Sequence, residues 1–474
     1  MKFTRRKKDL PKVDPVKIKP LFGLRPGLWL TIAYTLALLA VIFLVCMLPD
    51  IINGTKRVTF ESAVGTAAVY VDDVYQGGTP FTRKIASGTH NVSYRVNGQE
   101  IDSLTLKVGH PVFLNWLFPR TQTVTSNAQL TEAAFEALTA EFLQDVSSYS
   151  AILEYDSAHR YPEIFTSYAN AIAGGDFRTN SRAYETATMF LTTDEMYEDA
   201  VNAENIIGIN LLILYPQKDG SKVGKAADSP ALKATKTSLS AGTLQIEGFS
   251  IPEADFVNGR VTDPTYPEIL EAGTDVHTDA FNIGAYCITE YQYAVFVSKN
   301  PKWAASNKAS LITEGLVDDY YLSGITLSTT VKSTRPIRNI SWNAAQAFCR
   351  WLSDESGKNV YLPSQDQWTA AALTDQDMGF QKSLVPSEAE GAPSAMLGGV
   401  WEMTSSPVIP LARIFTQDWI ERAEEILEKY DVQTDMVVKG GSYISNMSDV
   451  DIYTVGTTYR SLCSDFMGFR IAWN

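Results

Sequence analysis

Residues 335–368 read RPIRNISWNAAQAFCRWLSDESGKNVYLPSQDQW, and this stretch decides the fold of the second half of the chain. Ser341 is a suitable N-cap, apolar side chains recur with helical spacing after it, and Gly357 is a suitable end. The pattern therefore predicts a helix over 343–357. The aromatic side chains expected in the core around it are Trp342, Phe348, Trp351, Trp368 and Trp401.

Three further motifs follow in order: GGVWEMTSS at 398–406, VVKGGSY at 437–443 and MGFRIAW at 467–473. Together with the first stretch, they resemble the formylglycine-generating enzyme family, also called the sulfatase-modifying factor family. The resemblance covers about half of the chain, over 243–474. It implies a mixed α/β domain related to the C-type lectin fold.

The resemblance also implies a catalytic site, but the residues that this site needs are missing. Active members hold copper(I) between two thiolates that precede a Tyr-Arg pair, which corresponds here to Tyr459 and Arg460. The thiolate positions are Asp451 and Gly456, and neither suits copper(I), which prefers sulfur ligands. His277 is the single histidine of this part of the chain, too few for an iron site. We therefore expect no catalytic residue and no cofactor.

A calcium site of the family is also eroded. Ala395 stands where the family has Asn or Asp, whereas Gly398, Val400 and Glu402 match the other ligands. Calcium takes about six to eight oxygen ligands, so one carboxylate and two carbonyls make a poor site. We expect Glu402 to be a vestigial calcium position with a structural role, and we expect no bound metal.

In the family, a groove beside these motifs receives the substrate. The residues that would line this groove are our predicted ligand-binding residues: Trp401, Tyr443, Asn446 and Arg460. An insertion at 412–435 borders the same region and predicts an amphipathic helix of about four to five turns. The helix either packs on its own domain or presents a partner-binding face. The candidate residues of that face are Phe415, Trp419, Ile426 and Tyr430.

Residues 27–48 form an uncharged run, GLWLTIAYTLALLAVIFLVCML. At about 1.5 Å per residue it crosses a bilayer core of roughly 30 Å. A cleaved signal peptide has a shorter apolar core and a small-residue cleavage site, so we expect a retained transmembrane helix. Residues 1–26 carry nine Lys or Arg against two Asp. The positive-inside rule therefore keeps this tail cytoplasmic and places the bulk of the chain outside the cytoplasm.

Residues 56–118 alternate as β-strands do, with turns at Gly77-Gly78 and Asn97-Gly98. The segments VYVDDVYQGGTP and SGTHNVSYRVNGQE resemble the PEGA domain, a small β-sandwich module of bacterial envelope proteins, although Asp73 replaces its usual hairpin glycine. The resemblance implies a spacer or interaction module near the cell surface. No catalytic group belongs to it.

Residues 124–216 form a mainly helical region. Its first helix should place Phe135, Leu138, Phe142 and Val146 on one apolar face, and 210–216 has the composition of a strand. Residues 217–242 carry five lysines among small polar residues, which predicts a polar linker.

The net charge of −14 is uneven, because the basic tail leaves about −21 on the rest of the chain. An acidic body of this kind argues against nucleic-acid binding. We thus predict an α+β protein anchored by a single span in the inner (cytoplasmic) membrane of bacteria. Its bulk would face the periplasm, with an inactive C-terminal domain that binds an envelope protein or a glycan. The alternative is an active sulfatase-modifying enzyme or related oxygenase that uses an altered site, such as one built on Cys463.

Overall fold

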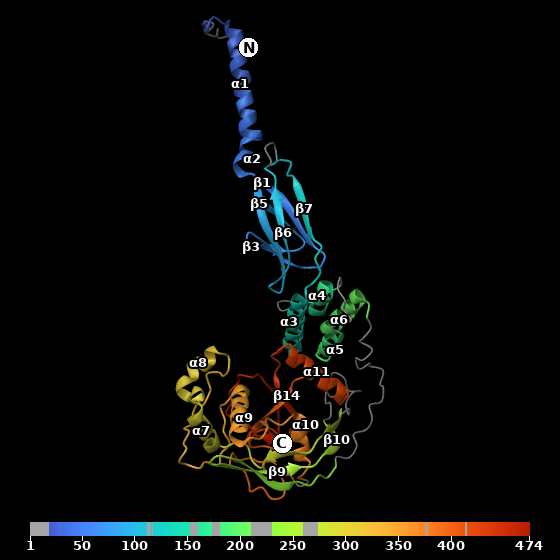
Figure 1. Cartoon of the computed structure of the whole chain (residues 1–474), viewed down its shortest axis with the longest axis vertical. Coiled ribbons are helices and arrows are strands. Elements are labelled where there is room, and N and C mark those ends of the chain that lie inside the picture. Colours follow the sequence, from blue (N-terminus) through green and yellow to red (C-terminus); the bar gives the residue numbers. More distant parts are fainter. Residues whose placement is uncertain are drawn as a thin grey trace, which may run out of the picture. The chain divides into compact units, whose positions relative to one another are not determined.

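The computed structural model describes residues 19–110, 115, 117–151, 160–172, 181–209, 230–258, 274–375, 378–412 and 415–474. They form two compact units, Met1–Ala134 and Phe135–Asn474 (Figure 1). The two units are described separately below.

The first unit begins with the long apolar helix α1 (Pro26–Cys46), followed by the short α2 (Leu48–Asn53). Pro26 starts α1, where a missing amide hydrogen costs nothing. The hydroxyls of Thr31 and Thr35 donate to backbone carbonyls one turn earlier, at 2.8 Å, so they need no outside partner. Within the described part of the chain, α1 is the one helix long and apolar enough to cross a membrane.

The rest of this unit is a pair of small sheets with strand orders β4-β1-β7 and β3-β2-β5-β6. The strands expected over 56–118 are present, and β7 extends the unit beyond the predicted boundary by pairing in parallel with β1. Asp72 and Asp73 both have positive φ, 50° and 65°, which is the geometry of a tight I′ hairpin. The strands are β1 (Thr55–Ser62), β2 (Ala68–Val71), β3 (Val74–Gly78), β4 (Phe81–Ala86), β5 (Gly88–Val96), β6 (Gln99–Val108) and β7 (Thr121–Ser126).

Four helices stand at the start of the second unit, and the first of them begins three residues before the unit boundary: α3 (Glu132–Ser150), α4 (Ile164–Ile172), α5 (Ser181–Thr188) and α6 (Asp194–Ile207). Aromatic rings form their core, with Phe142 stacked on Tyr168 at 4.1 Å between ring centroids. The buried carboxylate of Asp199 accepts hydrogen bonds from the amides of Phe165 and Thr166, at 2.8 and 2.9 Å, and so satisfies the start of α4. The strand predicted at 210–216 lies outside the described residues.

The remainder of the second unit is a mixed α/β domain built on two larger sheets, of orders β13-β18-β12-β9-β8 and β16-β15-β14-β17, and a β10-β11 hairpin. Its strands are β8 (Thr235–Ala241), β9 (Leu244–Ile251), β10 (Ala254–Asn258), β11 (Thr274–Thr278), β12 (Phe281–Gly284), β13 (Val360–Tyr361), β14 (Trp401–Pro407), β15 (Met436–Lys439), β16 (Val455–Thr458), β17 (Met467–Phe469) and β18 (Ala472–Trp473). Its helices are α7 (Glu290–Lys299), α8 (Lys308–Thr313), α9 (Trp342–Ser356), α10 (Gln365–Ala372), α11 (Gln417–Lys429) and the short 3₁₀ turns η4 (Pro301–Trp303) and η5 (Ala305–Asn307).

Helix α9 matches the prediction from sequence closely. The Ser341 hydroxyl accepts a hydrogen bond from the Ala344 amide at 3.1 Å, and Gly357 ends the helix in the left-handed conformation. Phe348 and Trp368 are buried, whereas Trp342, Trp351 and Trp401 are half-buried at the edge of the core.

The structure differs from the sequence analysis at the predicted linker. Residues 235–241, within the expected linker at 217–242, form β8 and pair with β9. Leu239 and Ala241 point into the core, while the other side of the strand is polar. Because most side chains of this segment are polar, its sequence resembles a linker and did not indicate a strand.

Candidate functional site

A buried ion pair lies at the centre of the C-terminal domain. Glu402 enters from β14, and Arg470 directly follows β17, the parallel neighbour of β14. The guanidinium of Arg470 donates to both carboxylate oxygens of Glu402, at 2.8 and 2.7 Å, and the Trp368 indole adds a third bond at 3.0 Å. Burial alone would lower the pKa of Arg470, but the charge of Glu402 outweighs this effect and the pKa is raised. Both partners are fully buried, so the pair is sealed from water.

The same guanidinium also binds the end of β12 and one loop. Arg470 donates to the backbone carbonyls of Gly284 and Ser394, at 2.8 and 2.9 Å. Ser394 directly precedes Ala395, the first position of the eroded calcium motif. Both oxygens of Glu402 thus face protein donors, which is the arrangement of a structural carboxylate.

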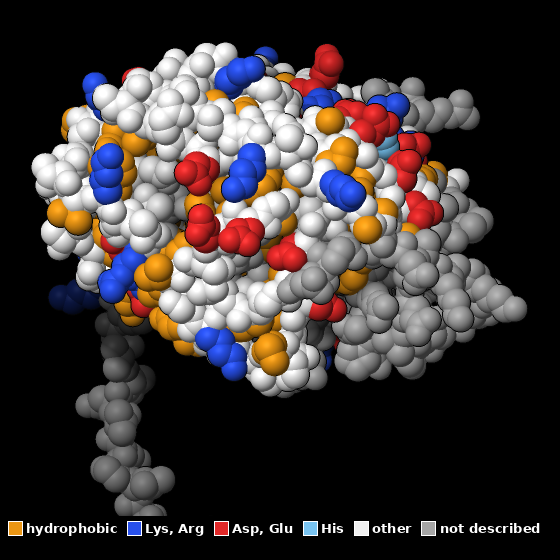
Figure 2. All heavy atoms as spheres, turned by 90° about the horizontal axis from the view of Figure 1, so that it is seen from below, with side chains coloured by type: hydrophobic (Ala, Val, Ile, Leu, Met, Phe, Trp, Pro, Cys, Tyr) orange, Lys and Arg blue, Asp and Glu red, His pale blue; other side chains and the backbone are white. Residues whose placement is uncertain are grey.

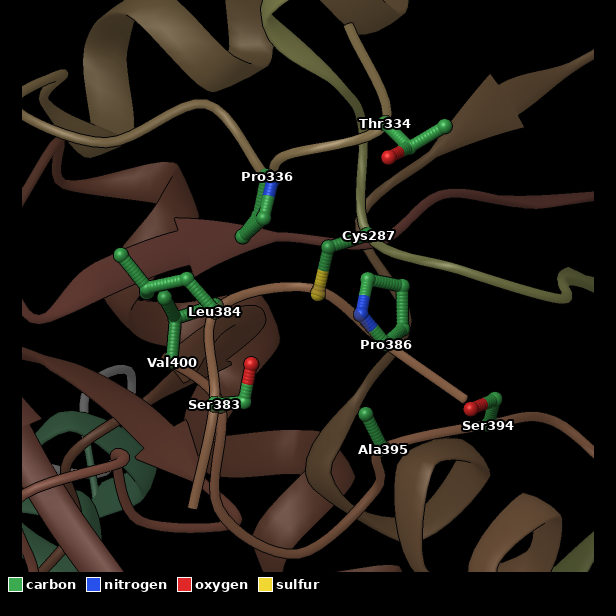
Figure 3. Close-up of a pocket in the computed structure, with 10 residues that line it drawn as sticks. Cys287, Thr334, Pro336, Ser383, Leu384, Pro386, Ser394, Ala395 and Val400 are labelled. Atoms are coloured by element: carbon green, nitrogen blue, oxygen red, sulfur yellow. The ribbon is translucent and has the colours of Figure 1, made fainter. Parts of the chain in front are cut away.

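Next to this pair lies a small cavity of about 20 Å³, room for about one water molecule. Figure 3 shows the sulfur of Cys287 at this cavity, with Pro336 and Pro386 close to it. Burial and the charge of Glu402 raise the pKa of this thiol well above its ordinary value. Cys287 is therefore a protonated, half-buried thiol that lines this cavity.

The positions of the two missing thiolates lie near the sheet that carries β14. Gly456 is on β16, opposite Val438 of β15. A Cβ at position 456 would lie 2.8 Å from Val438 Cγ2 and 3.1 Å from the ring of Trp401, so both neighbours would have to shift. Asp451 is exposed, and its carboxylate accepts the Tyr453 amide at 2.8 Å in a local turn.

The C-terminal domain also contains two deeply buried thiols. Cys463 and Cys349 are buried, and burial raises the pKa of each above its ordinary value. The amide of Cys463 donates to Asp318 at 2.9 Å, which holds the residue in its loop. All four cysteines of the chain are free, and the described residues contain no cluster of His, Cys, Asp or Glu that could hold a metal ion.

An open groove of about 410 Å³ runs beside Trp401 and Gly456. Its floor is the sheet, and its rim is formed by the loops before and after β16. Ile444 is 61% exposed and Phe466 36%, so apolar surface is available at the rim. The lining residues are Trp401, Val438, Ser442, Ile444, Ser445, Gly456, Thr457, Leu462, Ser464, Phe466 and Met467.

The structure brings together some of the predicted ligand-binding residues. Trp401 lines the groove, and Tyr443 packs its ring against Phe466, with centroids 5.8 Å apart. Asn446, three residues after Tyr443, is exposed, and its side-chain amide donates to the Asp449 carboxylate at 3.1 Å. The groove residues that sequence reasoning missed, such as Ile444 and Phe466, lie on loops without periodicity and gave no signal.

Arg460 contacts the segment that follows the inserted helix, and its predicted role in ligand binding stays a prediction. Its side chain donates to the backbone carbonyls of Thr434 and Val432, at 3.3 and 3.4 Å, and lies over the ring of Trp342. It is not among the residues that line the groove. Arg460 thus braces the segment that follows the inserted helix.

The inserted helix α11 packs against α5 and against β11 of its own domain. Phe415, which lies just before the first turn of α11, is buried, while Trp419, Ile426 and Tyr430 are half-buried. Two backbone amides that flank the helix donate hydrogen bonds to the α3–α6 region. The Leu411 amide donates to the Met189 carbonyl at 3.2 Å, and the Gln433 amide donates to the side-chain oxygen of Gln144 at 2.8 Å. The insertion therefore joins the helical region to the mixed α/β domain.

The face of the molecule drawn in Figure 2 mixes Lys and Arg with Asp and Glu among apolar side chains. This face carries no continuous basic area of the kind that nucleic acids need. The expectation that the protein does not bind nucleic acid stays a prediction.

Comparison with known proteins gives the following matches. A family model described as the sulfatase-modifying factor enzyme 1-like domain matches residues 235–391 and 386–474. An uncharacterized protein of Borreliella burgdorferi is 21% identical over 394 residues, which cover 74% of this chain and 78% of that protein.

Among solved structures, Treponema denticola variable protein 1 has a TM-score of 0.36 and 14% identity, over 50% of this chain and 99% of that one. CarF has a TM-score of 0.30 and 14% identity, over 48% and 98% of the two chains. PvdO from Pseudomonas aeruginosa also has a TM-score of 0.30 and 14% identity, over 52% and 100%.

Proposed function

Because this chain belongs to the sulfatase-modifying factor enzyme 1-like family through residues 235–474, we propose that it is a non-catalytic member of that family. In this proposal it is a binding or scaffold protein of the bacterial cell envelope. The N-terminal helix anchors it in the membrane, and the groove beside Trp401 receives an envelope protein or a glycan.

The observation that carries the proposal is the state of the two thiolate positions. In active relatives these thiolates hold copper(I), which needs sulfur ligands in low coordination. Here Asp451 is engaged in a turn, and Trp401 and Val438 pack directly on Gly456. The remaining thiols of this domain are protonated by burial, so none of them supplies a replacement thiolate.

The groove itself suits a binding role. Apolar surface from Ile444, Phe466 and Trp401 lies beside the hydroxyls of Ser445 and Thr457. Aromatic and aliphatic groups with a few hydroxyls bind apolar side chains of a peptide or the flat face of a sugar ring. Both ligand types fit an envelope location.

The anchor and the first β unit complete the proposal. Helix α1 is 21 residues long, has no buried side chain and satisfies the hydroxyls of Thr31 and Thr35 internally, which suits a single span. In this proposal the basic tail is cytoplasmic, and the PEGA-like β unit is a spacer or interaction module near the membrane.

The absence of catalysis is tested with the full-length protein, copper(I), oxygen and a peptide that carries a sulfatase-type cysteine. Mass spectrometry follows conversion of that cysteine to formylglycine. We expect no conversion above the copper-only control. Turnover that is lost in a Cys463→Ser variant would instead establish the alternative of an altered active site.

Binding in the groove is tested with a photo-crosslinking residue at position 445, which lines the groove beside Ile444, in full-length protein within its native membranes. Crosslinked proteins and glycans are identified by mass spectrometry. The matched variants are Ile444→Ser in the groove and Val331→Ser outside it, since both side chains are highly exposed, 61% and 64%. We expect Ile444→Ser alone to lose the partner. Equal capture by both variants would contradict the groove as the binding site.

A further inference from the structure

The residues directly after α2 are held to the first β unit by hydrogen bonds. The Ser87 amide donates to the Gly54 carbonyl at 2.6 Å, and the Asn115 side chain donates to the Thr55 carbonyl at 2.9 Å. Gly54 has a φ of 43°, and a Cβ there would lie 2.8 Å from the His110 ring and 2.9 Å from the Ser87 hydroxyl. A side chain at position 54, directly after α2, would therefore strain the backbone and displace His110 or Ser87, so the junction is tightly packed.

Strand registers identify which end of the β unit meets the anchor. Thr55 at the start of β1 pairs with Ala86 at the end of β4, and Gly88 at the start of β5 pairs with Val108 at the end of β6. Val108, the last residue of β6, and Thr121, the first residue of β7, therefore lie at the same end as α2 (Figure 1). The opposite end carries the β5–β6 turn, one strand length away, about 26 Å at roughly 3.3 Å per residue.

Four large apolar side chains are exposed at the end that meets the anchor. Ile51 and Ile52 of α2 are 41% and 71% exposed, and Leu117 and Phe118 before β7 are 52% and 68% exposed. We call these four residues the apolar rim. Apolar side chains gathered on one part of a surface usually mark a contact with another surface.

The chain itself indicates what that surface is. The rim begins only five residues after Cys46, the last residue of α1. Helix α2 has six residues, so its length is about 9 Å. The polar layer on each side of the bilayer core is roughly 5–8 Å thick, so residues at this distance from a span reach it. A partner at the rim must therefore lie directly against the membrane.

We propose that the apolar rim lies in the interfacial layer of the bilayer and forms a second membrane contact of the first β unit. This inference rests on the proposed membrane anchor. Four exposed apolar side chains at the end of the β unit that follows the span suit the boundary between acyl chains and headgroups. Together with the packed junction at Gly54, this contact fixes the β unit against the membrane surface instead of leaving it on a free tether.

The test uses the full-length chain in a Cys46→Ala background, reconstituted in vesicles of phosphatidylcholine and phosphatidylglycerol. One variant carries an environment-sensitive fluorophore at Phe118→Cys and a second carries it at Ile52→Cys. The matched control is Gln99→Cys, an exposed position at the opposite end of the unit. Cys349 and Cys463 are buried, and labelling of the Cys46→Ala parent measures any background from Cys287.

We expect the fluorophores at 118 and 52 to show blue-shifted emission and to lose fluorescence when lipids with a spin label near the headgroup are included. The fluorophore at 99 should show neither effect. Flotation of the vesicles tests the membrane anchor separately from the rim contact. A chain that does not float with vesicles overturns the anchor itself. A chain that floats, but whose label at 118 remains unquenched, retains the anchor and overturns the rim contact; a protein partner at the rim gives this second outcome.

Discussion

Replacing Glu402 by glutamine removes one buried negative charge while keeping the size of the side chain. The carboxylate accepts two bonds from Arg470 and one from Trp368, and none of the three residues is exposed. The variant leaves the guanidinium buried without its counter-charge, although its bonds to the carbonyls of Gly284 and Ser394 remain. Removing one partner of such a pair costs about 3–5 kcal/mol. We expect a loss of this size in the free energy of unfolding of the C-terminal domain.

The assay is equilibrium unfolding of the full-length protein in detergent, followed by tryptophan fluorescence, since Trp368 and Trp473 are buried in this domain. The control is Glu314→Gln, which breaks an exposed ion pair with Lys302 of similar length, 2.7 Å. Exposed pairs contribute little to stability, so this variant should unfold at the same denaturant concentration as the parent. If Glu402→Gln also unfolds at the denaturant concentration of the parent, the buried ion pair does not contribute the expected stability.

Three further predictions follow from the same structure. Gly456→Cys should lower the free energy of unfolding by about 1–3 kcal/mol, because its Cβ displaces Trp401, and should bind no copper(I) in a competition titration. A hydrogen bond to Asp72 raises the pKa of His90 above 6.5. The first unit should therefore lose stability as the pH rises through that pKa, and Asp72→Asn should abolish this dependence in pH-dependent unfolding. Burial and neighbouring carboxylates raise the pKa of Glu424 from 4.5 to about 7. Glu424→Gln should therefore stabilise the second unit at pH 8, by up to about 3 kcal/mol, and leave it unchanged near pH 4.

The sequence predicted elements whose signals are local. Helix α9 begins and ends as expected because Ser341 and Gly357 act on the adjacent backbone alone. The motif residues Glu402 and Arg470 could be located in the sequence, but their pairing could not. It depends on the parallel register of β14 and β17, which are separated by more than sixty residues.

Other features depend on contacts that no local pattern records. Strand β8 is polar on one side, so its buried Leu239 and Ala241 did not distinguish it from a linker. Arg460 lies next to the motif residues in sequence, yet its side chain turns toward the carbonyl of Thr434. The groove is formed by loops, where position in space follows from the packing of the whole domain.

The inserted helix α11 has a practical consequence for how the protein can be divided. The family match begins at residue 235, but the compact unit begins at Phe135. A fragment cut at 235 would expose the side of α11 that contacts α5, and it would lose the partners of Leu411 and Gln433. A protease cut between α6 and β8 should likewise leave two pieces that remain associated. The smallest stable fragment of the C-terminal half therefore starts at α3, about a hundred residues before the family match begins.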